Sequence, residues 1–264
     1  MTREPPTNYL RDVQYRTPDK LLARVSVHVL FSTNDYGWPR WLFDRLELPD
    51  ESDILEIGCG PATLWKSNAT KVPVGWRLTL TDFSPGMIQT AKANLEHGLE
   101  AVLEVADAQN LPFPEGSFDA VLAHHMLYHV PDKRAALSEI KRVLRGGGVL
   151  YAATNGPNHL RQLWELILKF APTATSTVNS DSFDLVNGPN QIGEFLNVIE
   201  VQEYPDSLAV TETDPLMDYI RSMSIQEITE SQLATIQDSL SESIRREGAF
   251  HIDKQAGLIT AVRL

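Results

Sequence analysis

The stretch from residue 53 to residue 64, Asp-Ile-Leu-Glu-Ile-Gly-Cys-Gly-Pro-Ala-Thr-Leu, constrains the fold of this chain more than any other. Its largely apolar residues 54–57 predict a buried strand, and Gly58 and Gly60 predict the turn that ends this strand. Pro61 is suited to the first position of a following helix. Glycines at such a turn let the backbone approach a ligand closely, and the helix start offers unpaired N–H groups. The stretch therefore predicts a nucleotide-like ligand at a strand-to-helix turn.

Charge and spacing within this stretch discriminate between cofactors. The dinucleotide-binding fingerprint needs a third small residue where this chain has Thr63, which disfavours a nicotinamide-dependent oxidoreductase, the first alternative. The carboxylate of Glu56 would also repel a pyrophosphate, and a low local dielectric strengthens that repulsion. S-adenosylmethionine carries an ammonium, a sulfonium and an adenosine but no phosphate, so it suits an acidic residue beside a glycine turn.

Two motifs carry a resemblance to a known family. Residues 55–60, Leu-Glu-Ile-Gly-Cys-Gly, resemble the first motif of class I S-adenosylmethionine-dependent methyltransferases, in particular the ubiquinone/menaquinone-type and other small-molecule members. Residues 81–87, Thr-Asp-Phe-Ser-Pro-Gly-Met, resemble the second motif of this family closely. The family often has a third glycine at the position of Ala62. The resemblance implies an α/β, Rossmann-like fold: a seven-stranded, mostly parallel sheet with an antiparallel final pair, helices on both faces and helical lid elements.

Acidic residues are expected to hold the cofactor at neighbouring strand ends. Asp82 lies 22 residues after Gly60, at the end of the second predicted strand, where a carboxylate accepts both ribose hydroxyls. By resemblance, Asp107 accepts from the adenine amino group and the next backbone N–H reaches a ring nitrogen. The predicted cofactor-binding residues are Glu56, Gly58, Cys59, Gly60, Asp82, Phe83, Met87, Asp107, Ala108, His124 and Tyr15.

A histidine-rich segment, residues 124–132, follows the fourth predicted strand. By resemblance, the methyl group and the acceptor lie beside it, and a backbone carbonyl near His124 holds the ligand ammonium. Histidine titrates near neutrality, so His125 is the predicted general base and Tyr128 a second candidate. Methyl transfer from a sulfonium can also proceed without a base, through alignment in a dry pocket. The spacing of these histidines does not predict a metal site.

The chain divides into three predicted regions: a helical cap (1–48), the S-adenosylmethionine-binding core (49–156) and lid helices that also complete the sheet (157–264). Alternating strands and helices in the core predict a parallel sheet whose ligand lies beyond the carboxyl ends of the strands. Residues 171–190, rich in Thr, Ser, Asn and Pro, predict a loop long enough to act as a mobile cover. Helices are predicted over 19–31 and 38–46, and the lid candidates by resemblance are Tyr9, Tyr15 and Tyr36.

Composition limits which binding partners and which cellular compartment are expected for this protein. The formal net charge is −12, and no Lys/Arg run exceeds two residues, so neither a nucleic acid nor an anionic membrane is an expected partner. The single cysteine, Cys59, fits a reducing compartment, and no apolar stretch approaches the roughly 20 residues of a membrane span, so a cytoplasmic protein is expected. A planar or apolar acceptor is suggested by the aromatic residues Trp38, Trp41, Trp164, Phe170 and Phe183.

The expected function is methylation of a small organic acceptor, and the residues do not separate O-, N- and C-methylation. A non-catalytic protein that binds S-adenosylmethionine as a sensor or scaffold would keep the same cofactor residues, and it is the second alternative. The residue pattern predicts no oligomeric state.

Overall fold

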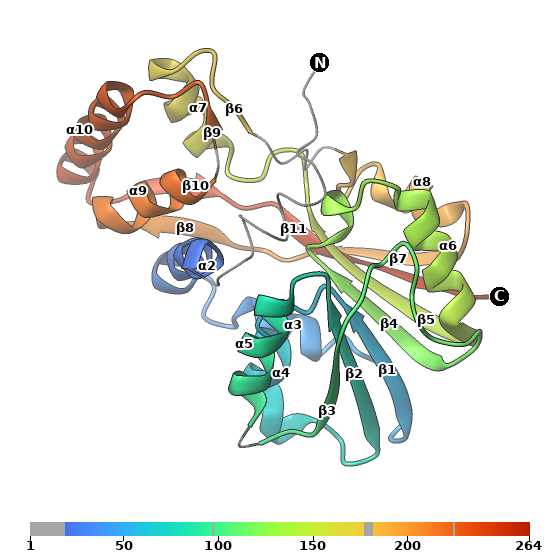
Figure 1. Cartoon of the computed structure of the whole chain (residues 1–264). Helices are drawn as coiled ribbons and strands as arrows, with labels where there is room; N and C mark the ends of the chain where they lie inside the picture. Colours follow the sequence, from blue (N-terminus) through green and yellow to red (C-terminus); the bar gives the residue numbers. More distant parts are fainter. Residues whose placement is uncertain (1–18, 97, 177–181, 224) are drawn as a thin grey trace.

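The computed structural model describes residues 19–96, 98–176, 182–223 and 225–264, and its centre is a seven-stranded sheet (Figure 1). The strands of this sheet are β1 (Ser52–Ile57), β2 (Trp76–Asp82), β3 (Ala101–Val105), β4 (Phe118–His124), β5 (Leu144–Asn155), β7 (Asn197–Glu203) and β11 (Ala256–Val262). Their order is β3-β2-β1-β4-β5-β11-β7. The first five run parallel, whereas β11 is antiparallel to β5 and β7. The predicted fold class is therefore confirmed.

Helices cover both faces of the sheet because side chains alternate along each strand. Ile54 and Leu80 belong to a hydrophobic cluster that α3 (Trp38–Phe43), α4 (Thr63–Asn68) and α5 (Pro85–Leu95) complete. Leu55 and Ile57 belong to the cluster on the opposite face, which α6 (Lys133–Val143) and α8 (Gly188–Gly193) complete. The two clusters hold the strand ends in register, so the loops that follow β1 to β4 meet at one edge.

Local capping explains where several helices begin. Ser84 and Asp132 each accept a backbone N–H with their side chains at the starts of α5 and α6. Thr229 and Gln232 form a capping box before α10 (Glu230–Glu247). The predicted helix over 38–46 is too long, because α3 ends at Phe43.

The helix after the glycine turn, α4, begins at Thr63 rather than at Pro61. Gly60 and Ala62 have φ angles of +53° and +56°, so the backbone is left-handed just before the helix and cannot start it earlier. The position of Ala62 therefore favours glycine on conformational grounds, since only glycine adopts this region without strain.

A second group of elements, the helical unit, lies to one side of the seven-stranded sheet (Figure 1). It consists of α2 (Asp19–Phe31), α7 (Arg161–Phe170), β8 (Ser207–Val210), α9 (Thr213–Ser222), α10 and β10 (Phe250–Asp253). These elements share a hydrophobic cluster of their own, with Val27, Leu208, Ile220, Ile236 and Ile252 at its centre. The helical unit thus joins α2, from the predicted cap, to helices from the predicted lid region. The short elements are η2 (Ala69–Lys71), η3 (Leu127–His129), β6 (Thr175–Ser176) and β9 (Ile225–Gln226).

The predicted long loop over 171–190 is irregular at 171–174 and 183–187, but two regular elements interrupt it. β6 occupies Thr175–Ser176, α8 begins at Gly188, and residues 177–181 lie outside the described residues. Phe183 is 1% exposed in the core beneath α8, and the Thr154 hydroxyl donates to the Phe183 carbonyl at 3.0 Å. The sequence pattern also missed β10, which pairs with β8. Within the described ranges, no helix combines the length and apolar character that a bilayer span requires.

Candidate active site

The turn after β1 is held open by its glycines. Gly58 has a φ of +67°, and a Cβ on it would lie 2.8 Å from the Met126 Cβ, closer than side chains pack. The Cys59 N–H donates to the Thr81 carbonyl at 2.9 Å, which ties this turn to the end of β2. The turn therefore lies between the ends of β2 and β4, as the predicted ligand site requires.

Asp82 ends β2 and is fixed by the backbone around it. Its carboxylate accepts the Gly60 N–H at 2.9 Å and the Ser84 N–H at 2.8 Å. Burial raises the pKa of Asp82 and the nearby Glu56 carboxylate adds to this, while the two hydrogen bonds oppose the rise. A carboxylate has about four acceptor positions, so two remain for ribose hydroxyls.

Asp107 follows β3 by two residues and lies at the next strand end. Val105, the last residue of β3, pairs with Asp82, so the two carboxylates occupy the same edge of the sheet. The Asp107 carboxylate accepts the Gln109 backbone N–H at 2.9 Å and the Gln109 side-chain amide at 3.0 Å. The structure thus brings together two of the three predicted acids, each oriented by local hydrogen bonds.

The third acid, Glu56, is not at a strand tip. It is the next-to-last residue of β1, is 3% exposed, and points to the face covered by α4. Its carboxylate accepts the indole N–H of Trp65 at 2.5 Å. Trp65 was not predicted as a site residue, because only the folding of α4 onto β1 brings it to Glu56. The expected direct role of Glu56 toward a ligand cation stays a prediction.

His124 ends β4 and lies beside Glu56, with its Nδ1 3.4 Å from the Glu56 Oε1. Both imidazole nitrogens are buried, and within the described residues neither has a hydrogen-bond partner. Such groups usually find partners, since leaving one unpaired costs about 1–3 kcal/mol. The unpaired imidazole beside the glycine turn is the feature of this structure that best fits a polar ligand.

His125, the predicted general base, has an unusual backbone for a residue other than glycine. Its φ is +53°, and its N–H donates to the Ala153 carbonyl at 2.8 Å. Burial lowers its pKa to about 3, and neighbouring histidines and Lys254 add to this. A neutral imidazole with so low a pKa takes up protons poorly near neutrality. This lowered pKa is more consistent with transfer by alignment than with base catalysis, and the role of His125 stays a prediction.

The other predicted site residues differ in accessibility. Cys59 is buried, and burial with the Glu56 and Asp82 charges raises the pKa of its thiol well above the usual range, so it is unreactive. Ala108 is buried beside Asp107 and Phe83 is half-buried, whereas Met87 is 1% exposed and has no free surface for adenine in this structure. Tyr9 and Tyr15 lie outside the described residues.

The predicted lid and acceptor aromatics separate into two groups. Trp38 stacks on Trp41 at 5.2 Å between ring centroids and contacts His125 at 5.4 Å, so it borders the candidate site. Phe183 belongs to the sheet core instead, which contradicts its predicted place on an acceptor surface. Tyr36 donates its hydroxyl to Asp44 at 2.6 Å on the protein surface. Trp164 and Phe170 pack on the cluster of the helical unit.

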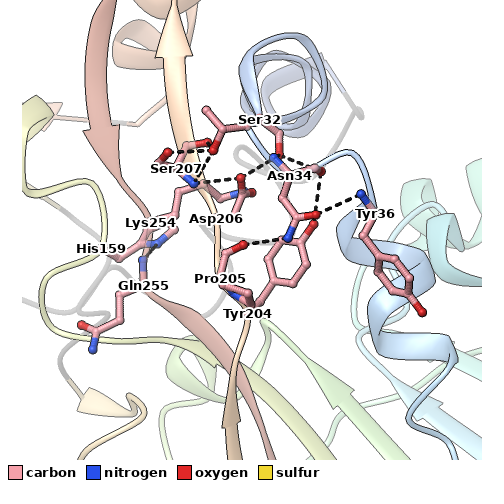
Figure 2. Close-up of polar contacts among 11 residues, drawn as sticks. Ser32, Asn34, Tyr36, His159, Tyr204, Pro205, Asp206, Ser207, Lys254 and Gln255 are labelled. Atoms are coloured by element: carbon pink, nitrogen blue, oxygen red, sulfur yellow. Dashed lines mark hydrogen bonds and ion pairs between the residues drawn. The ribbon is translucent and has the colours of Figure 1, made fainter.

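A polar network connects the sheet to the helical unit at the junction between them (Figure 2). The Lys254 ammonium and the Asp206 carboxylate form an ion pair whose side chains are 8% and 1% exposed. Asp206 also accepts from the Ser32 hydroxyl at 2.8 Å, and the Asn34 amide donates to the Pro205 carbonyl at 2.7 Å. The network therefore links the α2–α3, β7–β8 and β10–β11 connections.

This strand order, with a glycine turn after β1 and carboxylates after β2 and β3, defines the class I methyltransferase fold. Residues 55–152 match the family described as "Methyltransferase domain". Residues 55–152 therefore match a methyltransferase domain, as their motifs predicted, and a domain of this kind implies S-adenosylmethionine as the cofactor.

Curated relatives align with about half of the chain. The chain is 30% identical over 117 residues to the ubiquinone/menaquinone biosynthesis C-methyltransferase UbiE of Geobacter sp. (strain M21), covering 43% of this chain and 50% of the relative. It is 32% identical over 136 residues to the demethylmenaquinone methyltransferase of Staphylococcus haemolyticus, covering 50% of this chain and 57% of the relative. The chain thus spans about half the length of these relatives.

Solved structures share the fold over more of the chain. The YcgJ protein of Bacillus subtilis has a TM-score of 0.60 at 17% identity, covering 85% of this chain and 97% of that one. The [4+2]-cyclase SpnF has a TM-score of 0.58 at 16% identity, covering 98% of this chain and 97% of that one. At these identities the similarity is one of fold.

Proposed function

We propose that this protein transfers the methyl group of S-adenosylmethionine to a small organic acceptor in a pocket closed by the helical unit. The observation that carries the proposal is the pair of carboxylates, Asp82 and Asp107, fixed at adjacent strand ends beside the turn at Gly58. Acids in this arrangement suit an adenosine compound, and Glu56 and Thr63 are the residues that disfavour a dinucleotide. The unpaired imidazole of His124 offers a further polar contact.

Each residue has a proposed task when the cofactor is bound. Asp82 accepts from the ribose hydroxyls, Asp107 from the adenine amino group, and the backbone near His124 holds the ammonium. S-adenosylmethionine supplies a methyl group on a positively charged sulfur. The acceptor atom would bond to this methyl carbon as the C–S bond breaks and its electron pair goes to sulfur, and a proton lost by the acceptor would pass to water once the pocket opens. The protein's contribution is alignment and exclusion of water.

A small organic acceptor is supported by the names of the relatives, which are quinone-pathway methyltransferases. The region that matches the methyltransferase family, residues 55–152, does not reach α7, α9 or α10, so the family match does not define which acceptor this chain takes. The formal charge of −12 argues against a nucleic acid or an anionic membrane as the partner. We place the protein in the cytoplasm as part of this proposal.

Calorimetric titration with S-adenosylmethionine and S-adenosylhomocysteine tests the proposed function. Asp82→Ala should weaken binding by about 1–3 kcal/mol through lost hydrogen bonds. The matched control is Asp50→Ala, which removes the same charge from an exposed residue just before β1. An unchanged affinity in Asp82→Ala, or a protein that quenches NADH fluorescence but ignores both adenosine compounds, would contradict the proposal.

A second candidate is a protein that binds S-adenosylmethionine without transferring its methyl group. It is favoured by the fold similarity to a [4+2]-cyclase over 98% of this chain and by the weak basicity of His125. The two functions differ in one product, because only methyl transfer releases S-adenosylhomocysteine. An acceptor screen in which the cofactor binds and no S-adenosylhomocysteine forms would favour the second candidate.

A further inference from the structure

Three histidines from distant parts of the chain gather at the junction of the sheet and the helical unit. His28 lies on α2, His125 in the turn after β4, and His159 in the β5–α7 connection. The rings of His28 and His159 have centroids 6.1 Å apart, and each of the three rings interacts electrostatically with at least one of the others. We call His28, His125 and His159 the junction histidines.

The Nδ1 atom of His159 forms a hydrogen bond and the Nδ1 atom of His28 does not, and this difference determines how each ring could bind a ligand. The His159 Nδ1 accepts the Gln255 N–H at 3.2 Å, so a neutral ring carries its own proton on Nε2 and donates from there. The His28 Nδ1 is buried and has no hydrogen-bond partner among the described residues. One ring thus offers a fixed donor, and its neighbour offers a nitrogen without a partner.

The surroundings of the junction histidines keep them uncharged. The pKa of each is lowered to about 3, chiefly by burial, and the Lys254 ammonium contributes to the lowering in all three. Figure 2 shows His159, Lys254 and Gln255 side by side at the junction. A protonated amine has no lone pair, so it could not accept from the His159 Nε2–H. An oxygen group can accept that hydrogen bond.

Aromatic rings border the same region. Tyr219 on α9 meets the His28 ring edge-on at 5.9 Å, and Trp38 meets the His125 ring at 5.4 Å. Trp38 is itself held by Trp41 and by Tyr204 at 5.3 Å. Fixed aromatic surfaces favour a flat ring compound. A metal is not indicated, since the described residues contain no group of three or more ligating side chains arranged around an ion.

We propose that His28 and His159 bind the methyl acceptor and select a ring compound that presents a hydroxyl or carbonyl oxygen rather than an amine. This inference rests on the proposed function, because it assumes that the junction beside His125 receives the acceptor. The His159 Nε2–H donates to the acceptor oxygen, and the His28 Nδ1 gains the partner that it lacks. The acceptor ring then lies between α2 and α9 on one side and the turn after β4 on the other.

Protein with ¹³C-labelled histidine, saturated with S-adenosylhomocysteine, provides the test. Phenol is the oxygen probe, benzylamine is the amine probe, and toluene reports ring packing alone. Phenol should shift the imidazole signals of His28 and His159, assigned from His28→Asn and His159→Asn, and benzylamine should leave them in place. Equal shifts with benzylamine or toluene, or no shift with phenol, would overturn the proposal.

Two substitutions of His159 distinguish loss of phenol binding from loss of the folded structure. His159→Asn keeps an acceptor for the Gln255 N–H but removes the Nε2 donor, so phenol should bind about fivefold more weakly, the loss expected for one hydrogen bond. His159→Gln keeps a donor near the Nε2 position and should retain more of the affinity. His251→Gln changes an exposed histidine of β10 and should leave phenol binding as in the wild type. A His159→Asn protein that binds phenol like the wild type would overturn the proposal.

Calorimetry with S-adenosylhomocysteine on the same samples distinguishes failure of the proposed function from failure of the proposed acceptor site. If S-adenosylhomocysteine fails to bind, the proposed function fails with it. If it binds and the junction histidines ignore phenol, only the proposed acceptor site is wrong.

Discussion

At the scale of single residues, the turn after β1 depends on the absence of one side chain. Gly58 combines a left-handed backbone with a close approach to Met126, so a Cβ is excluded for two reasons at once. Gly116 has only the first of these two features, the left-handed backbone. It has a similar φ of +65°, but nothing lies within 4 Å of a Cβ built on it.

Gly58→Ala should therefore cost more stability than Gly116→Ala. We expect a loss of about 1 kcal/mol for Gly116→Ala from backbone strain alone. Gly58→Ala should lose about 1–3 kcal/mol more, because the turn or Met126 must shift. Urea unfolding measures both free energies, and Met126→Gly, which removes the contacting Cβ, should recover part of the loss caused by contact in Gly58→Ala. Equal losses at the two glycines would show that contact with Met126 is unimportant.

Glu56 and Trp65 form the second residue-scale feature. The indole N–H is a hydrogen-bond donor to a buried carboxylate, so Trp65→Phe should destabilise the protein by about 1.5–3 kcal/mol beyond the packing loss. Urea unfolding of Trp65→Phe, Glu56→Gln and the double variant gives the coupling between the two side chains. Trp76→Phe is the matched control, since the Trp76 indole donates to the Pro49 carbonyl at 2.9 Å. A coupling free energy near zero would show that the hydrogen bond between Trp65 and Glu56 does not stabilise the protein.

At the scale of elements, the junction between the sheet and the helical unit depends on the ion pair of Asp206 and Lys254. Removing one partner of a buried pair leaves the other charge uncompensated, so Asp206→Asn should cost about 3–5 kcal/mol. Asp206→Asn combined with Lys254→Met should recover much of that loss, because no buried charge remains. Glu247→Gln, which breaks the exposed pair with Arg246, should change the unfolding free energy by less than about 1 kcal/mol. A double variant as unstable as Asp206→Asn would contradict this account.

The helices and strands also differ in how well the sequence predicts them. The strands, the glycine turn and the caps at Ser84, Asp132 and Thr229 were predictable because each depends on residues close together in the chain. The antiparallel last pair came from the family resemblance. The contacts of Glu56 with Trp65 and of His28 with His159 were not predictable, because they form only when separate helices pack. Residues 188–190 were misread because Gly and Pro are also residues that begin a short helix such as α8.

At the scale of the whole molecule, buried neutral histidines make stability depend on pH. The pKa values of His28, His125, His129 and His159 are each lowered to about 3, chiefly by burial, from an ordinary value near 6.5. Between these values the unfolded chain binds protons that the folded protein does not, so folding is disfavoured as the pH falls. Each histidine then contributes a slope of up to about 1.4 kcal/mol per pH unit.

The protein should therefore be most stable above pH ~6.5 and should lose stability steeply between about pH 6 and pH 4. The raised pKa of Asp82 acts in the opposite direction, but it is one carboxyl against four imidazoles. Urea unfolding at pH 7 and pH 5 should differ by more than about 4 kcal/mol. An NMR titration of the histidine ring protons checks the cause, with the exposed His251 as a reference resonance outside the buried group. If the four buried rings take up protons near pH 6.5 while the fold persists, the junction is open to water, and the dry pocket proposed for methyl transfer loses its physical basis.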